Sequence, residues 1–184
     1  MQIKPTTILL GAFLFFITKN AEARSLWEFN TGPKFTITSG TLNINGTKFA
    51  QPWKINSFLT AVGGEYITQN LFNNVYTFNE LGVHVYEHPK QEVANEVQVS
   101  FVKQKLKFAP KNNFQGIFKI EKVAITRKTN IQKVIKSLPS YKFTRGDEGN
   151  FYRGEYKGVY VYLNYSDNSF KLVDFISFGM AGIE

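Results

Sequence analysis

The chain has 184 residues, no cysteine and a formal net charge of +8 at pH 7. The absence of cysteine excludes disulfides, cysteine nucleophiles and thiolate zinc sites, and a chain of this length can bury a core without them. The positive charge suits acidic partners or an anionic surface, but no recognised nucleic-acid-binding motif is present, so nucleic acid is not an expected partner.

The first 23 residues have the pattern of a cleaved secretory signal peptide. Lys4 supplies a positive charge, an apolar run covers 7–17, and Ala21-Glu22-Ala23 is the small-x-small sequence that signal peptidase reads. The apolar run is too short to span ~30 Å of hydrocarbon. We therefore expect a mature protein of residues 24–184, periplasmic or secreted, without a lipid anchor or a transmembrane segment.

Residues 35–49 are predicted to form strands that include a tight hairpin. Apolar and polar residues alternate over 35–38, and a second extended segment covers 41–44, as is typical of half-buried strands. Asn45-Gly46 is a strong signal for a two-residue turn, and it leads into a further strand at 47–49.

A short helix is expected next, over residues 55–62. Its apolar side chains are spaced to share one helix face, and Gly63-Gly64 follow as a stop signal. After a variable loop, strands are predicted at 75–79 and 83–86, joined by a turn at Leu81-Gly82. A last strand at 97–101 closes this part of the chain.

The second half of the chain repeats this pattern at a constant offset of 76 residues. Identical residues without a gap include Gly82, Val83, Val85 and Tyr86, which recur as Gly158, Val159, Val161 and Tyr162. The offset predicts strands at 117–120, 123–125, 151–155, 159–162 and 172–178, and a helix that begins at Ile131 and ends at Pro139. Because apolar positions match apolar positions, the pattern indicates an internal duplication.

The predicted fold class is α+β, with two tandem repeat units of order strand–strand–helix–strand–strand–strand. Each unit is expected to be an antiparallel sheet backed by one short helix. The signal peptide covers 1–23, the first unit 24–106 and the second unit 107–184. The basic stretch 102–113 between them is either a solvated connection or a charged contact surface.

A candidate binding surface follows from the alternation in the strands. If the valines of 83–86 and 159–162 point toward the helices, their neighbours form an uncovered sheet face. Tyrosine buries a large area at low entropic cost and is enriched at binding hot spots. The predicted partner-binding residues are His84, Tyr86, His88, Tyr160 and Tyr162. Alternatively, these tyrosines are simply good strand formers, or the two sheets pack together there.

Neither metal binding nor catalysis is predicted. His84 and His88 would lie about 13 Å apart along a regular strand, which is too far for one zinc ion. The sequence has no Gly-x-Ser-x-Gly elbow, no His-Glu-x-x-His and no phosphate-binding glycine loop. We therefore expect no enzyme activity, no catalytic residue, no metal and no cofactor.

The Asn-Gly turn, the helix that closes at Gly63 and the tyrosine-containing strand that leads to Gly82-Val83 resemble uncharacterised exported bacterial domains. Some domains of that kind serve as immunity proteins. The tandem arrangement over residues 40–178 also resembles the β-lactamase inhibitory proteins, which implies a concave surface that grips an enzyme. The paired cysteines of that inhibitor family are missing, so no inhibitory residue is carried over.

The resulting hypothesis is a non-enzymatic periplasmic protein-binding module, an inhibitor or immunity protein that occludes a partner enzyme. Lysines between Lys103 and Lys111 would steer acidic partners toward it. The alternative is an envelope-associated protein that binds an anionic glycan or lipid through its basic surface. The partner's identity, the oligomeric state and the accessibility of the tyrosines stay open at this point.

Overall fold

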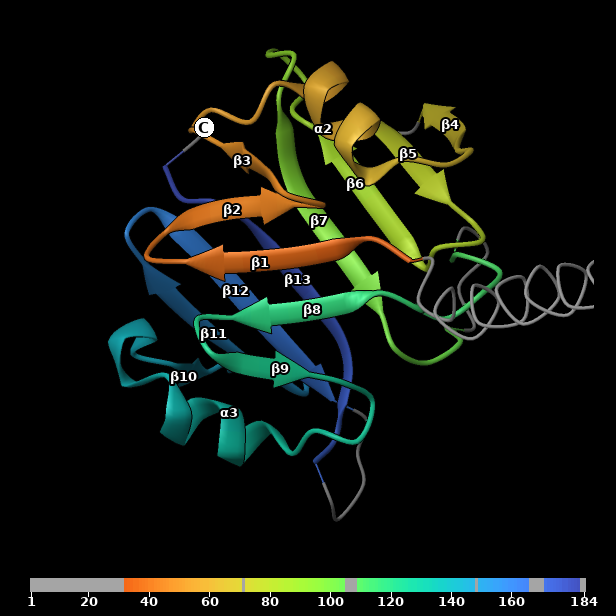
Figure 1. The fold of residues 1–184 in the computed structure, drawn as a ribbon. Helices are drawn as coiled ribbons and strands as arrows, with labels where there is room; N and C mark the ends of the chain where they lie inside the picture. The colour runs from red at the N-terminus through yellow and green to blue at the C-terminus, as the bar shows by residue number, and fades with distance from the viewer. Residues whose placement is uncertain (1–31, 71, 105–108, 148, 166–170, 183–184) are drawn as a thin grey trace, which may run out of the picture. The chain divides into compact units, whose positions relative to one another are not determined.

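The computed structural model describes residues 32–184 except 71, 105–108, 148, 166–170 and 183–184. These residues are mostly β structure, arranged as two sheets with two short α-helices (Figure 1). The predicted signal peptide lies outside the described residues. Within them, no helix is long and apolar enough to cross a membrane.

The smaller sheet takes strands from both halves of the chain, in the order β3-β2-β1-β8-β9. Its strands are β1 (Lys34–Thr38), β2 (Thr41–Ile44), β3 (Thr47–Phe49), β8 (Ile117–Ile120) and β9 (Val123–Ile125). Neighbours are antiparallel except at the centre, where β1 and β8 run parallel with Phe35 beside Phe118. This parallel pair joins the two halves.

The larger sheet has eight antiparallel strands in the order β10-β11-β12-β13-β7-β6-β5-β4. Its strands are β4 (Ile67–Asn70), β5 (Asn74–Phe78), β6 (Val83–Glu87), β7 (Ala94–Ser100), β10 (Thr144–Arg145), β11 (Phe151–Tyr156), β12 (Val159–Tyr165) and β13 (Val173–Met180). Here too the halves meet at the centre, because β7 pairs with β13.

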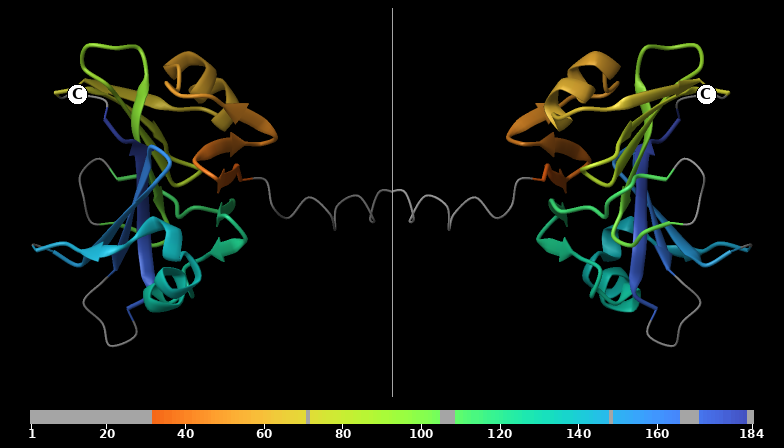
Figure 2. Two further views of the ribbon diagram at one scale, coloured as in Figure 1. Left: turned by 90° about the vertical axis from the view of Figure 1, so that its left-hand side faces the viewer. Right: turned by 90° about the vertical axis from the view of Figure 1, so that its right-hand side faces the viewer.

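Two helices complete the layer that covers the larger sheet. Helix α2 (Ile55–Val62) lies beyond β3 and helix α3 (Ile131–Ser137) beyond β9, on the same side of the larger sheet as the smaller one (Figures 1 and 2). The predicted apolar face of α2 is buried, and α3 begins where the Asn130 side chain accepts hydrogen bonds from two backbone amides. The 3-10 helix η1 (Pro139–Tyr141) follows α3.

The predicted Asn45-Gly46 hairpin is present and connects three elements. Both residues have positive φ, 52° and 93°, as the mirror-image hairpin turn requires. The Asn45 Oδ1 atom accepts from the Lys34 backbone N–H at 2.8 Å, and its Nδ2 donates to the Ala61 carbonyl at 2.8 Å. The turn therefore links β1 to the end of α2.

An aromatic cluster packs the two sheets together where the halves meet. The Phe178 ring of β13 lies 5.8 Å from Phe35 on β1 and 5.4 Å from Phe118 on β8, between ring centroids. Trp53, which precedes α2, is also within 6.1 Å of Phe178. All four side chains are buried, so the joins in both sheets share one core.

The prediction that each half carries its own sheet is wrong. Elements of 41–100 and 117–180 do follow one another in the same order, with β4 and β10 as strands that the sequence did not predict. However, pairing of β1 with β8 and of β7 with β13 merges the halves. The physical reason is that separate units would leave these strand edges unpaired and their apolar faces exposed.

Because the halves share both sheets, neither should fold alone. We expect fragments 32–106 and 107–184 to lack a cooperative thermal transition, since each loses the β1–β8 and β7–β13 pairings. Far-UV circular dichroism during heating measures this, with the joined chain 32–184 as the control. A sigmoidal transition in either isolated fragment would contradict the prediction.

Candidate functional site

Two neighbouring rows of side chains cross the centre of the larger sheet on the face opposite its valine core. In one row, register places His84 beside Gln98, Gln98 beside Ser177, and Ser177 beside Tyr162. The strands β6, β7, β13 and β12 contribute one residue each. Residues from the two halves of the chain therefore lie on a single face.

The second row runs parallel to the first. Register places Tyr86 beside Glu96, Glu96 beside Gly179, and Gly179 beside Tyr160. We call the side chains of both rows the tyrosine face: His84, Tyr86, Glu96, Gln98, Tyr160, Tyr162 and Ser177. The three tyrosines are half-buried, so they are not enclosed between two packed sheets.

Tyr160 reaches across its neighbouring strand because that strand has a glycine there. A Cβ added to Gly179 would lie 2.5 Å from the Tyr160 Cζ atom, so any side chain would displace the ring. The Tyr160 hydroxyl donates toward the Glu96 Oε2 atom at 3.3 Å and the Asn95 carbonyl at 3.4 Å, both on β7. One tyrosine of β12 thus spans β13 and contacts β7.

Burial sets the protonation of this cluster. Burial and then the nearby Glu96 carboxylate raise the pKa of Tyr160 well above its usual range. Burial also raises the pKa of Glu96, although hydrogen bonds from Ser177 and Tyr160 oppose that shift. The Tyr160 hydroxyl is therefore a fixed donor at neutral pH, and the cluster is an array of polar tips on aromatic rings.

Aromatic packing continues from Tyr160 toward the edge of the sheet. The Tyr162 ring meets Tyr160 edge to face at 5.4 Å and Phe151 at 5.5 Å. The exposed Arg153 guanidinium lies 5.8 Å from the Tyr162 ring centroid and 3.8 Å from the Glu155 carboxylate. The combination of half-exposed tyrosines and an arginine has the composition of a protein-binding hot spot.

The two histidines are more buried than predicted. His84 is only 4% exposed: its Nδ1 atom lies 3.0 Å from the Thr77 hydroxyl, and the Tyr86 ring packs beside it. Burial lowers the pKa of His84 to about 4, so the imidazole is neutral at pH 7. His88 is 7% exposed and follows a bulge at the end of β6. Both are poorly placed as direct contacts.

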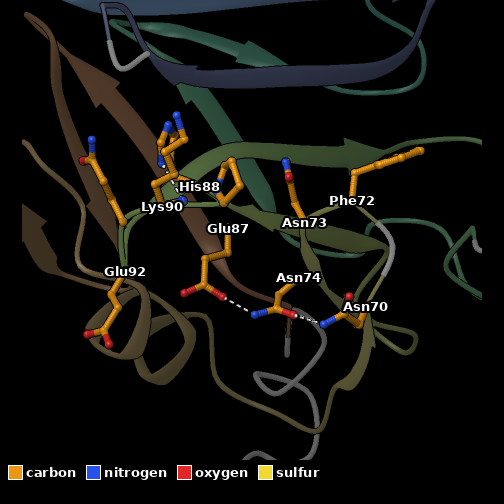
Figure 3. A pocket seen from close by; sticks show the side chains of 10 residues that line it. Asn70, Phe72, Asn73, Asn74, Glu87, His88, Lys90 and Glu92 are labelled. Carbon is orange, nitrogen blue, oxygen red and sulfur yellow. Dashed lines mark hydrogen bonds between the residues drawn. The ribbon is translucent and has the colours of Figure 1, made fainter.

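His88 instead lines a small polar pocket of about 290 Å³ between the β4–β5 and β6–β7 connections (Figure 3). The Glu87 Oε2 atom accepts from Asn74 Nδ2 and from the Tyr76 hydroxyl, each at 2.8 Å. The His88 Nδ1 atom accepts from the Lys90 backbone N–H at 3.2 Å. The Glu87 carboxylate and the His88 imidazole are therefore both engaged in hydrogen bonds within the protein.

No cluster of three or more metal-ligating side chains occurs among the described residues.

In the predicted basic stretch, the side chains of Lys103 and Lys111 are exposed, while residues 105–108 lie outside the described part of the chain.

Four members of the central rows were not among the predicted partner-binding residues: Glu96, Gln98, Ser177 and Gly179. Glu96 was missed because the predicted strand began one residue later, at Val97. Gly179 was missed because it lies beyond the predicted end of β13. The available signal was a glycine within an otherwise apolar and aromatic run, since such a glycine often marks close approach of another group.

A protein-family model described as "Domain of unknown function (DUF7738)" matches residues 34–135, which is more than half of the chain. The match confirms the prediction of an uncharacterised domain. No curated protein and no solved structure matches the chain.

Substitution of Gly179 should destabilise the protein through two overlaps, one with the Tyr160 ring and one with the Asn95 carbonyl. We expect Gly179→Ala to lower the free energy of unfolding by about 1–3 kcal/mol, because the new methyl group overlaps the Tyr160 ring and the Asn95 carbonyl. In a Tyr160→Ala background the cost should fall by about 1 kcal/mol, since only the carbonyl overlap remains. Urea unfolding of the four proteins measures this coupling. Equal costs in both backgrounds would contradict it.

Stability should fall as the pH drops from 6.5 toward 4 because of His84. Its lowered pKa means that the unfolded chain binds a proton in this range while the folded protein does not. Between these pH values we expect the free energy of unfolding of the wild type to fall by up to roughly 3 kcal/mol because of His84. The His84→Gln variant should lose less over the same range. Urea unfolding at several pH values measures the difference.

The Glu96 carboxyl has the opposite effect on the free energy of unfolding. Because its pKa is raised in the folded state, proton uptake there stabilises the protein as the pH falls. Glu96→Gln is therefore the control, and it should retain the His84-dependent loss. Identical pH profiles of the wild type and His84→Gln would exclude a neutral buried imidazole.

Proposed function

Since the chain belongs to the DUF7738 family of domains of unknown function, we propose a function from its own geometry. The protein is a non-enzymatic binding module whose tyrosine face covers a partner protein. Within that role, it acts as an inhibitor or immunity protein that blocks the active site of a partner enzyme. The proposed location is the periplasm or the extracellular space, after cleavage of the signal at residues 1–23.

The observation that carries this proposal is the alignment of Tyr86, Tyr160 and Tyr162 in two adjacent rows of one continuous sheet. Their rings are ordered by packing and by the Glu96 and Gln98 side chains, so little conformational entropy is lost when a partner binds. The three tyrosines are half-exposed, and the Tyr86 and Tyr160 hydroxyls, which donate hydrogen bonds within the face, can still accept one from a partner. Such preordered amphipathic rings are typical of binding hot spots.

Internal duplication gives this face a simple origin. Tyr86 and Tyr162 are equivalent at the offset of 76 residues, and His84 is equivalent to Tyr160. We infer that an ancestral unit carried one such strand and that its two copies then diverged. In the first copy the His84 side chain became buried in the fold. In the second copy the equivalent Tyr160 side chain extends across Gly179. The β12 side of the face is accordingly its proposed centre.

Electrostatic steering is the proposed role of the basic side chains around the face. Arg153 is exposed beside Tyr162, and Lys103 and Lys111 are exposed in the connection between the halves. Such charges at the rim raise the association rate with an acidic partner and contribute less to the final affinity. Binding through the face should therefore survive high salt once formed.

Capture of a partner tests the proposal. Tagged protein of residues 24–184 is exposed to an extract of the source cells and to the product of the adjacent open reading frame, at low and high salt. We expect one stoichiometric protein that survives high salt. The double substitution Tyr160→Ala and Tyr162→Ala should weaken binding by about 2 kcal/mol or more, roughly 30-fold. The captured protein should also lose its enzymatic activity in the complex.

Tyr66→Ala is the matched control, because Tyr66 is an exposed tyrosine outside the face that packs against Tyr76 and Phe78. It should leave the affinity unchanged. Loss of binding with Tyr66→Ala alone would move the interface to the β4 edge. If the protein captures only envelope material that dissociates at high salt, and if the tyrosine substitutions do not change this capture, the inhibitor function is contradicted.

A further inference from the structure

The outward face of the smaller sheet carries three lysines and no carboxylate among its strand residues. Register places Lys48 of β3 beside Asn43, Asn43 beside Thr36, and Thr36 beside Lys119 of β8. Lys34 lies two residues before Thr36 on β1. These residues alternate with the buried apolar ones, so they point away from the larger sheet and the tyrosine face.

The strand spacing sets the distances between the lysines. Lys48 and Lys119 are three strands apart, which corresponds to about 14 Å between their backbones, and Lys34 lies about 7 Å from Thr36 along β1. The only ion pair among the described residues is Arg153 with Glu155, so all three ammonium groups lack a carboxylate partner in the described chain. They are available to an anionic ligand.

A hollow of about 560 Å³ lies on this face, between Lys34 and Lys48. Its lining includes the side chains of Thr36, Thr38, Thr41 and Asn43. The Asn43 Oδ1 atom accepts from the Gly46 backbone N–H at 2.9 Å, which leaves its Nδ2 group as a donor. Hydroxyl and amide groups in the hollow, with ammonium groups around it, complement a ligand that has both hydroxyl groups and negative charges.

One acidic side chain lies near the end of this sheet, in the β8–β9 turn. The Glu121 Oε1 atom accepts from the Ser39 backbone N–H at 2.7 Å. This carboxylate is engaged with the backbone and lies outside the hollow's lining.

We propose that the outward face of the smaller sheet is a binding site for an acidic oligosaccharide. Lys34, Lys48 and Lys119 bind its carboxylate groups, while the threonines and Asn43 bind its hydroxyl groups. A flat lipid surface fits less well, because the exposed large hydrophobic side chains of the described residues, Tyr66, Ile67 and Phe72, lie on or beside β4, outside this sheet. The site is independent of the proposed partner binding through the tyrosine face.

Titration calorimetry with a hexamer of galacturonate, which carries one carboxylate on each sugar, tests the site. We expect binding at low ionic strength that weakens as salt is added, and no binding of uncharged maltohexaose. The triple substitution of Lys34, Lys48 and Lys119 by Gln should reduce the affinity at least tenfold. Thr36→Val should reduce it less, because one hydroxyl contact is lost.

A second triple variant separates a local site from general charge. Lys90, Lys133 and Lys136 are exposed lysines on other elements, and their substitution by Gln changes the net charge by the same amount. This control should bind the hexamer like the wild type. An equal loss in both triple variants, or no hexamer binding by the wild type at low salt, would overturn the proposal.

Vesicles that contain anionic phospholipid provide the last comparison. Binding to vesicles without binding to the hexamer would overturn the oligosaccharide assignment in favour of a membrane surface. Circular dichroism spectra and unfolding midpoints of both triple variants show whether the fold is retained. Because the lysines have no ion-pair partner in the described chain, we expect both variants to fold as the wild type does.

Discussion

The pairing of β7 with β13 is the constraint on which the rest of this structure depends. It joins the two halves into one eight-stranded sheet, while β1 and β8 join them again in the smaller sheet. Phe178 on β13 packs against Phe35 and Phe118 at the second join, so one aromatic cluster stabilises both connections. Two short helices then cover the parts of the larger sheet that the smaller sheet leaves open.

The same pairing creates the tyrosine face. Side chains of β6 and β12 would lie on separate surfaces if each half had its own sheet, but the shared sheet aligns them in register. The central strand β13 contributes small residues, Ser177 and Gly179, and this space lets Tyr160 reach Glu96 on β7. The result is a face whose rings are ordered by their neighbours before any partner binds.

The two outward faces of the molecule differ in chemistry because different strands supply them. The larger sheet presents aromatic rings with polar tips, and the smaller sheet presents lysine, threonine and asparagine. Sheet packing leaves only alternate residues of each strand for the outside, so the faces are free to diverge while the core stays constant. The two proposed binding sites therefore lie on opposite sides of the molecule.

Local signals in the sequence determined most of the secondary structure. The Asn45-Gly46 hairpin, the buried face of α2 and the valine strands follow from turn chemistry and periodicity, and all are present. β4 and β10 were not predicted, because they are short, mostly polar and exposed.

Tertiary structure alone decided how the strands combine and which candidate residues are accessible. Alternation assigned His84 to the same face as Tyr86, but the neighbours Thr77 and Tyr86 bury it. The reach of Tyr160 over Gly179 likewise depends on a strand that is distant in sequence. Periodicity records which side of a strand a residue occupies, whereas its exposure depends on long-range pairing that no local pattern contains.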